Sequence, residues 1–335
     1  MFLHNHTDEN GFFPRMIIWQ LTKKKPAYGA GATETPESDA LSTHECLLII
    51  DSIARVAKPI IVLTGKKVVE RPDLLQIVEY GFALGMKIII EVYPQELTDE
   101  IIEKYVKFGP KVFRILLDGA ITEDMDNRFK QTAQFQALEN CLRRLKKAGY
   151  EIHLGSNVQE PDMRQLAFEH DYALQKSANG LYCHLTWDAA LITDKEKVAE
   201  TDPLIEQFIY KIAQMKRLSP KGMYFSPQCI KYGLQDIPAA EEGAPQQDEH
   251  KVRVEWAHWC LAGRSFIFIG PTGAVQPCVS LKKTCGHLRE NNYNFKKIWF
   301  ESEMLNKLRG EVLSCPGVRE QLLVTSLSET SDKEE

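Results

Sequence analysis

A regular alternation of strand-like and helix-like segments between residues 16 and 218 is the feature that most constrains the fold of this chain. The run KPIIVLTG at 58–65 is continuously apolar, as a strand covered on both faces would be. The segment 42–57 that precedes it has apolar residues at helical spacing behind a capping box of Ser42 and Glu45. Strands alternating with crossover helices predict an α/β fold with a parallel sheet or partial barrel.

Six strand–helix units are expected in this region. We expect strands at 16–22, 58–65, 86–94, 111–119, 151–158 and 180–187, with helices at 42–57, 72–84, 98–108, a long helix ending near 149, 162–176 and 203–218. The segment QDIPAAEEGAPQQDE at 235–249 is rich in Pro, Gly and acidic residues, which is typical of a linker or lid. Beyond it we expect a hairpin turning at Pro271–Gly273 and a helix over 295–313.

Charge and hydropathy exclude several partners. The net charge of −5 provides no basic field for nucleic acid. No apolar run reaches the roughly 18 residues that span a bilayer, so no membrane partner is expected. The first residues lack the charged and apolar regions of a secretory signal. Eight cysteines without a C-x-x-C pair then predict reduced thiols in a cytoplasmic protein.

The loop after the first expected strand should carry chemistry, because such loops line the ligand-binding mouth of a parallel sheet. Residues 23–36 contain lysines, glycines and alanines but no Cys, His, Asp or Ser. The chain also lacks G-x-S-x-G, H-E-x-x-H and G-x-x-x-x-G-K-[ST] motifs. The residues alone therefore indicate no standard catalytic arrangement.

Motifs in both halves nevertheless resemble one family. Trp19-Gln20-Leu21-Thr22, the run LTGKKVVERPDL at 63–74 and Leu116-Leu117-Asp118-Gly119 follow one another in the first half. Cys260-x12-Gly273-x4-Cys278, Gly286-His287-Leu288-Arg289-Glu290 and Ile298-Trp299 follow in the second half. Over residues 14–318 the chain is similar to radical S-adenosylmethionine enzymes with a C-terminal SPASM or twitch domain, and most to their tetrapyrrole- and peptide-modifying branch.

The resemblance implies a fold and a domain division. It implies a partial (β/α)6 TIM-like barrel with a small C-terminal α+β domain of the SPASM or twitch type. We expect the barrel over 1–234, a linker or lid over 235–254, and a truncated C-terminal domain with a frayed tail over 255–335.

The motifs that bind the family's cofactors depart from the pattern. Lys25, Gly29 and Ala32 stand where three cluster-binding cysteines are expected, and Lys66 and Lys67 follow Gly65 where the resemblance places a Gly-Gly-Glu sequence. A [4Fe–4S] cluster is held by thiolates, and none of these side chains has one. The sequence therefore predicts that the [4Fe–4S] cluster and S-adenosylmethionine are both absent and that this chain performs no radical chemistry.

The lysines at the expected barrel mouth are candidates for binding an anion. Two ammonium groups about 5 Å apart repel by roughly 3 kcal/mol at an effective dielectric of 20, so they either extend into solvent or share an anion. A carboxylate or phosphate, such as a tetrapyrrole side chain or a peptide terminus, fits the second case. Glu91 is expected to pair with a lysine. The ligand-binding candidates are Lys25, Lys66, Lys67, Glu91, Asp118, Asn157 and His184.

Several of these residues have a structural alternative. Asp118 matches an acid that the family retains, or caps the turn with Gly119; His184 is either a ligand or a hydrogen-bonded interior residue. In the C-terminal domain, Cys260, Cys278 and Cys315 are expected to be thiols left from a lost cluster, with zinc or an iron–sulfur remnant as the alternatives. The family's next cysteine is replaced by Val318.

Three functions remain open from the sequence. The favoured one is a pseudoenzyme in a biosynthetic pathway that binds a partner protein (an intact paralogue, for example), a peptide or a small anionic, tetrapyrrole-like ligand. The second is a metal-free enzyme that uses the lysines and carboxylates at the barrel mouth. The third is an iron–sulfur protein that does not cleave the cofactor.

Overall fold

A computed structural model describes most of the expected elements. It describes residues 11–22, 39–108, 112–117, 132–158, 163–185, 223–226, 262–278 and 283–310. Its strands are β1 Met16–Gln20, β2 Ile60–Thr64, β3 Lys87–Val92, β4 Val112–Leu116, β5 Glu151–Val158, β6 Gly180–Leu185, β7 Met223–Ser226, β8 Phe266–Ile269, β9 Ala274–Gln276 and β10 Gly286–His287.

These strands form a single 10-stranded sheet in the order β10-β9-β8-β1-β2-β3-β4-β5-β6-β7. Every neighbouring pair from β8 through β1 to β7 is parallel. The carboxyl ends of these strands therefore meet at one edge, as the partial-barrel prediction requires. The fold class is the predicted one.

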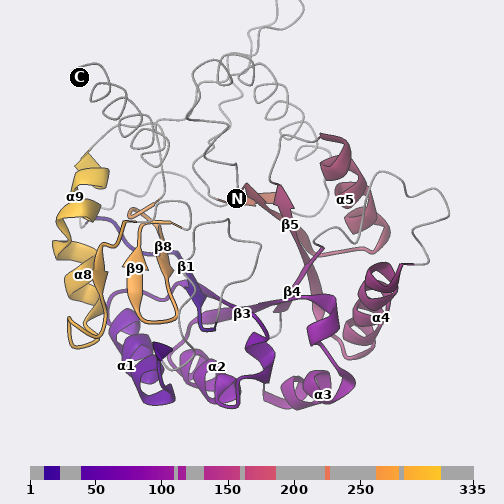
Figure 1. The fold of residues 1–335 in the computed structure, drawn as a ribbon, viewed down its shortest axis with the longest axis horizontal. Coiled ribbons are helices and arrows are strands. Elements are labelled where there is room, and N and C mark those ends of the chain that lie inside the picture. The colour runs from indigo at the N-terminus through magenta and orange to yellow at the C-terminus, as the bar shows by residue number, and fades with distance from the viewer. Residues whose placement is uncertain are drawn as a thin grey trace, which may run out of the picture.

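Helices cover the outer side of the curved sheet. They are α1 Thr43–Ala54, α2 Leu74–Ala83, α3 Asp99–Phe108, α4 Ala133–Lys147, α5 Met163–Gln175, α8 Phe295–Glu301 and α9 Glu303–Gly310, with short 3-10 turns η3 Val68–Glu70 and η4 Pro94–Glu96. Figure 1 shows α1 to α4 following one another around the outside of the strands. The α1 helix begins with the predicted capping box, since both reciprocal contacts of Ser42 and Glu45 are present.

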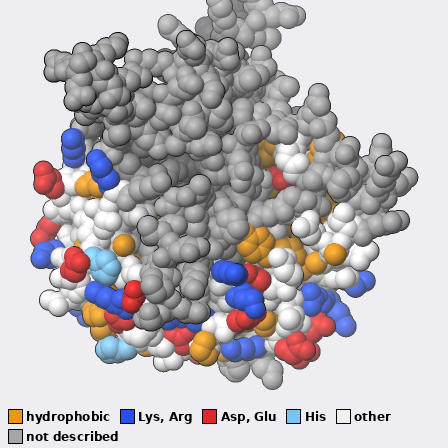
Figure 2. All heavy atoms as spheres, viewed as in Figure 1, with side chains coloured by type: hydrophobic (Ala, Val, Ile, Leu, Met, Phe, Trp, Pro, Cys, Tyr) orange, Lys and Arg blue, Asp and Glu red, His pale blue; other side chains and the backbone are white. Residues whose placement is uncertain are grey.

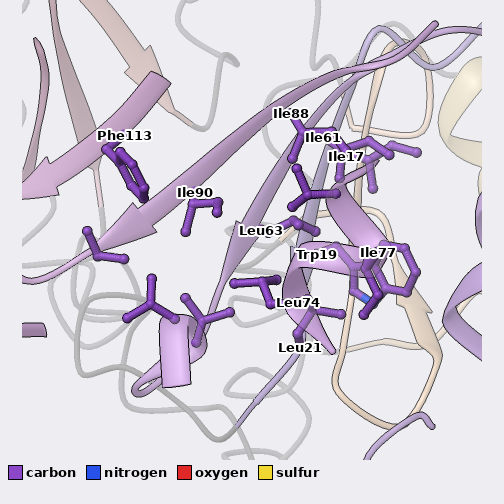
Figure 3. Packing of buried hydrophobic residues seen from close by; sticks show 14 of the residues in the cluster. Ile17, Trp19, Leu21, Ile61, Leu63, Leu74, Ile77, Ile88, Ile90 and Phe113 are labelled. Carbon is purple, nitrogen blue, oxygen red and sulfur yellow. The ribbon is translucent and has the colours of Figure 1, made fainter. Parts of the chain in front are cut away.

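Alternate residues of each strand face two different environments. Ile17, Trp19 and Ile61 belong to the large apolar core between sheet and helices (Figure 3). Ile18 and Val62, their neighbours in sequence, belong to a second, smaller apolar cluster. Since side chains alternate along a strand, this second cluster marks the inner face of the curved sheet.

The C-terminal segment continues the same sheet. Strand β8 pairs with β1 in parallel, with Met16 opposite Phe266. The predicted hairpin is present: β8 and β9 are antiparallel, and Ile269 lies opposite Val275 across the turn. The α8 and α9 helices lie beside this hairpin in Figure 1. The domain boundaries expected at 234 and 254 fall outside the described residues and stay predictions.

Two elements differ from the prediction. The helix expected over 295–313 is interrupted at Ser302, which has an extended backbone with a ψ of 119°, so that α8 and α9 are separate. The short β7 strand was not expected, because four residues, MYFS, are too few to show a period. The helix expected at 203–218 lies outside the described residues.

The visible outer surface carries mixed charge. Figure 2 shows Lys and Arg side chains interspersed with Asp and Glu over the described part of that face. None of the helices in the described residues combines the length and apolar character needed to cross a bilayer.

Candidate functional site

A row of polar residues crosses the inner face of the sheet at one register. Glu91 of β3 lies opposite Arg114 of β4, and Arg114 lies opposite His153 of β5. The inner-face residues two positions earlier on β2 and β3, Val62 and Ile89, belong to the apolar cluster. The polar row is therefore a distinct layer inside the partial barrel.

Glu91 and Arg114 form a buried ion pair. The Arg114 Nη1 atom lies 3.3 Å from Glu91 Oε2, and the two side chains are only 2% and 0% exposed. The hydroxyl of Thr64, at the end of β2, donates to Glu91 Oε1 across 3.0 Å. Each charge compensates the other, which is what allows both to lie where water is excluded.

One face of the Arg114 guanidinium is held by packing. Its central carbon lies 3.8 Å from the centroid of the Tyr182 ring, so the ring covers one face of the group. Gly155 on β5 makes this position possible. A Cβ at Gly155 would come within 2.8 Å of Leu116 Cδ2 and 3.3 Å of Arg114 Cδ. The absent side chain leaves room for the arginine stem to cross toward β6.

Two nitrogens of Arg114 are left over. Its Nε and Nη2 are buried and have no hydrogen-bond partner among the described residues. A buried donor without an acceptor costs about 1–3 kcal/mol, and more when it is charged. Unsatisfied donors on a fixed cation are therefore the strongest sign of a ligand on this face.

His153 is the third member of the polar row and lies opposite Arg114 on β5. Its Nε2 lies 3.2 Å from Glu151 Oε2, and its ring centroid lies 5.5 Å from that of Tyr182. Burial lowers the pKa of His153 below its usual value, and the nearby charge of Arg114 lowers it further. The ring is therefore held mainly in its neutral form at neutral pH, with Nδ1 unpartnered among the described residues.

The structure places the predicted lysines elsewhere. Lys67 Nζ lies 3.0 Å from Glu70 in an exposed pair, and the Lys67 backbone N–H donates to Glu96 across 3.0 Å. Lys66 is exposed and makes no ion pair within the described part of the chain. Glu91 forms its ion pair with Arg114, which shares its face and register, and neither Lys66 nor Lys67 pairs with it among the described residues. The expected pairing with Lys25 lies outside the described residues and stays a prediction.

The other predicted residues are only partly described. Asn157 and His184 lie opposite each other on β5 and β6, and their side chains are outside the description. Lys25 and Asp118 lie outside the described residues, as do the remaining degenerate cluster positions, Gly29 and Ala32. Their roles stay predictions.

The turn after β2 is closed against the end of β1. The hydroxyl of Thr22 donates to the carbonyl oxygen of Lys66 across 2.8 Å. Gly65 has a φ of 135°, and a Cβ there would overlap the Thr22 hydroxyl. Both the backbone angle and the close approach require glycine at position 65.

Arg114 and Tyr182 are site residues that the sequence reasoning missed. A signal for Arg114 was available, since it is the one charged residue inside the apolar run VFRILL at 112–117. A charge in the middle of a buried strand needs a partner, and Glu91 is an acidic residue inside the apolar run of the preceding strand. Tyr182 gave no such signal, because its contact with Arg114 depends on the missing side chain of Gly155.

The thiols of the C-terminal segment differ in their surroundings. Cys278 is 5% exposed and packs in the inner-face cluster with Phe266 and Phe268. Burial raises the pKa of Cys285 to about 12, so this residue is held as a thiol. Cys260 and Cys315 lie outside the described residues. Within the described ranges, no three His, Cys, Asp or Glu side chains are grouped to hold a metal ion.

Comparison with known proteins relates the chain to one enzyme family. Residues 260–322 match the SPASM family model, described as an iron–sulfur cluster-binding domain. The AdoMet-dependent heme synthase of Methanosarcina barkeri is 25% identical over 88% of this chain and 85% of its own length. The protein of the same name from Oleidesulfovibrio alaskensis is 26% identical over 88% of this chain and 76% of its own length.

Solved structures share the fold. Streptococcus suis SuiB bound to S-adenosylmethionine has a TM-score of 0.57 at 13% identity, covering 89% of this chain and 66% of that chain. The anSMEcpe protein with bound AdoMet has a TM-score of 0.54 at 11% identity, covering 88% of this chain and 79% of that chain. At these identities the likeness concerns architecture.

These findings correct the prediction about cofactors. The expectation that both the [4Fe–4S] cluster and S-adenosylmethionine are absent is wrong: the C-terminal match is to an iron–sulfur cluster-binding domain, and the relatives are AdoMet-dependent. Thiolates are the usual ligands of such clusters, and Cys278 is a described thiol that fits this donor type. Cys260, Cys278 and Cys315 all lie in the matched segment and stay the residues predicted to hold a cluster there.

Proposed function

We propose that this chain, a member of the radical S-adenosylmethionine family with a C-terminal SPASM domain, binds a carboxylate-bearing tetrapyrrole on the inner face of its sheet. The proposed role is binding rather than radical chemistry. An intact relative that performs the chemistry would be the natural protein partner of such a chain.

The names of the relatives support the ligand class. Three matching proteins are called AdoMet-dependent heme synthase, and a match over 45% of this chain is called Fe-coproporphyrin III synthase. Haem and coproporphyrin are tetrapyrroles whose rim carries ionised carboxylates. A binding site for either needs an apolar surface and fixed cationic donors.

The single observation that carries the proposal is Arg114. It is a buried cation on the inner face, with apolar residues Ile89 and Leu116 in the cluster on that face and two donors without a described partner. Buried donors without a partner are uncommon in folded proteins, and two of them on one charged group favour a ligand at this place. The inner face therefore combines apolar residues with a fixed cationic donor, the two properties that a site for a carboxylate-bearing porphyrin requires.

The residues after β1 support binding without radical chemistry. Lys25, Gly29 and Ala32 stand at the positions where the family's cysteines are expected, and none of them offers sulfur. A cluster in the C-terminal domain is compatible with this role, because the proposed ligand contact uses none of the cysteines.

A porphyrin titration tests the proposal. The full chain, purified without oxygen, is titrated with coproporphyrin III and with its tetramethyl ester, and the Soret absorbance is followed. We expect saturable one-to-one binding of the acid and at least tenfold weaker binding of the ester. Equal binding of both, or none of either, rejects the proposed ligand. In a parallel assay with reductant and S-adenosylmethionine, stoichiometric 5′-deoxyadenosine would reject the non-catalytic role.

A further inference from the structure

We infer that Arg114 is the carboxylate receptor of this site, and that its Nε and Nη2 edge takes one carboxylate group in a two-point contact. The inference rests on the proposed function and deepens it, since it assigns the contact to one residue and one chemical group. It also states that the site binds carboxylates in preference to phosphates, because the negative charge of Glu91 lies beside it.

The two unpartnered nitrogens are neighbours on the guanidinium. Nε and Nη2 present parallel N–H groups along one edge of the planar group, whereas Nη1 lies on the other side and faces Glu91. The spacing of such an edge matches the two oxygens of a carboxylate. One edge of Arg114 is thus occupied by the protein, and the adjacent edge is suited to a ligand.

The surroundings fix where this edge points. The Tyr182 ring, 3.8 Å away, covers one face of the guanidinium, and the stem crosses Gly155, where a Cβ would lie 3.4 Å from Arg114 Cγ. Glu91 anchors Nη1 and is itself held by the hydroxyl of Thr64. The arginine therefore has little freedom to turn its free edge toward another acceptor, and the site is preorganised.

The charge of Glu91 limits what can bind. Arg114 already faces one carboxylate, so a ligand carboxylate shares the charge of this arginine with Glu91. A monoanionic carboxylate adds one negative charge to this pair, whereas a phosphate dianion adds two in a place where screening by water is weak. The site therefore favours a carboxylate, and replacing Glu91 by a neutral residue should relax this preference.

Matched variants measure the contribution of the arginine. Arg114→Gln removes the charge, Arg114→Lys keeps the charge but cannot offer two parallel donors, and Arg143→Gln changes an exposed arginine on α4 as the control. Binding of coproporphyrin III should weaken at least tenfold in Arg114→Gln and by an intermediate factor in Arg114→Lys. Arg143→Gln should bind as the wild type does.

A double variant guards against misfolding. Arg114→Gln alone leaves Glu91 buried without its partner, so Glu91→Gln with Arg114→Gln removes both charges together. Far-ultraviolet circular dichroism checks that each variant is folded. If the folded double variant binds coproporphyrin III as tightly as the wild type, Arg114 is not the receptor, while porphyrin binding itself still stands.

Nuclear magnetic resonance separates this inference from the proposed function. The Arg114 Nε–H signal, identified by its loss in Arg114→Lys, should shift on adding sodium propionate and stay in place with sodium phosphate at equal ionic strength. If the wild type binds no porphyrin but this signal shifts with propionate, the tetrapyrrole proposal fails and the carboxylate receptor stands. An unmoved signal overturns the receptor, and an equal shift with phosphate overturns its preference for carboxylates.

Discussion

Arg289 and Glu45 lie 244 residues apart in the chain, and Arg289 Nε donates to Glu45 Oε1 across 2.6 Å. A second bond runs from Arg289 Nη2 to Glu45 Oε2 across 3.0 Å. The same carboxylate accepts the backbone N–H of Ser42 across 2.7 Å and so closes the start of α1. One glutamate therefore begins a barrel helix and fastens the C-terminal segment to it.

Replacing Glu45 by Gln should lower the free energy of unfolding by about 1.5–3 kcal/mol at pH 7. The amide keeps the size of the side chain but loses the charge-assisted bonds from Arg289. Urea denaturation of the full chain measures the change. Glu103→Gln, at an exposed position on α3, is the matched control and should stay within about 0.5 kcal/mol of the wild type.

The contribution of Glu45 should also depend on pH. Its hydrogen bonds from Arg289 hold its pKa well below the ordinary value of 4.5. In acid the unfolded chain therefore binds a proton at Glu45 before the folded chain does, and stability falls as pH falls. The difference between wild type and Glu45→Gln should be full above pH 4.5 and shrink steadily below it. A difference that stays constant from pH 6 to pH 3 contradicts this assignment.

Gly155→Ala should disturb the packing of the Leu116 and Arg114 side chains against β5. The added methyl would meet Leu116 Cδ2 at 2.8 Å and Arg114 Cδ at 3.3 Å, so at least one of these side chains would have to shift. We expect a loss of about 1–3 kcal/mol in unfolding free energy, as for other overpacked interiors, and weaker binding of coproporphyrin III. Gly270→Ala serves as control, since its nearest contact would be an ordinary 3.6 Å. Equal effects of the two substitutions would show that the crowding argument is wrong.

Arg71 ties together the segments that flank the loop after β1. Its Nη1 donates to the carbonyl oxygen of Leu21 across 3.1 Å, and its Nη2 donates to that of Leu41 across 2.7 Å. Its Nε donates to Asp73 Oδ1 across 2.6 Å. Arg71→Lys keeps the charge but cannot reach all three acceptors, so we expect a loss of about 2 kcal/mol in unfolding free energy. Arg143→Lys, on the surface, should leave the unfolding free energy unchanged. If Arg71→Lys also leaves it unchanged, the three hydrogen bonds of Arg71 do not hold these segments together.

Iron content tests the C-terminal thiols. Protein reconstituted with iron and sulfide without oxygen should hold iron, and Cys278→Ala should lower the iron bound per chain because a thiolate ligand is lost. Cys285→Ala should leave the iron unchanged, since the Cys285 Sγ atom packs against Met304 Sδ at 4.0 Å and Cys285 is not one of the three cysteines expected to hold a cluster. Both are read by iron analysis and absorbance near 400 nm. Loss of iron in Cys285→Ala alone would reverse the assignment of these two residues.

Much of the fold could be predicted because its signals are local. The strand at 151–158 was expected and found with the same bounds, since Gly149 marks the end of the preceding helix and the polar Gln159-Glu160 and Pro161 follow the strand. The capping box at Ser42 depends only on a residue three positions away. The interruption at Ser302 is harder to anticipate, because the apolar spacing runs on through both α8 and α9.

The site was less predictable because it depends on pairing between distant strands. The sequence marked Glu91 as a candidate and predicted a lysine as its partner, since lysines follow the ends of the expected strands. The ion pair of Glu91 with Arg114 follows from the register of β3 and β4, which places the two residues opposite each other. The position of Tyr182 over the arginine depends further on Gly155, whose missing side chain acts only in three dimensions.

The parallel pairing of β8 with β1 has a consequence for biogenesis. Met16 finds its neighbour Phe266 only when that residue has left the ribosome, so β1 is an open sheet edge for most of translation. Open edges attract other strands and favour aggregation. A nascent chain that stops before β8 would therefore expose its first strand permanently, and molecules truncated in this way should depend on chaperones to stay apart.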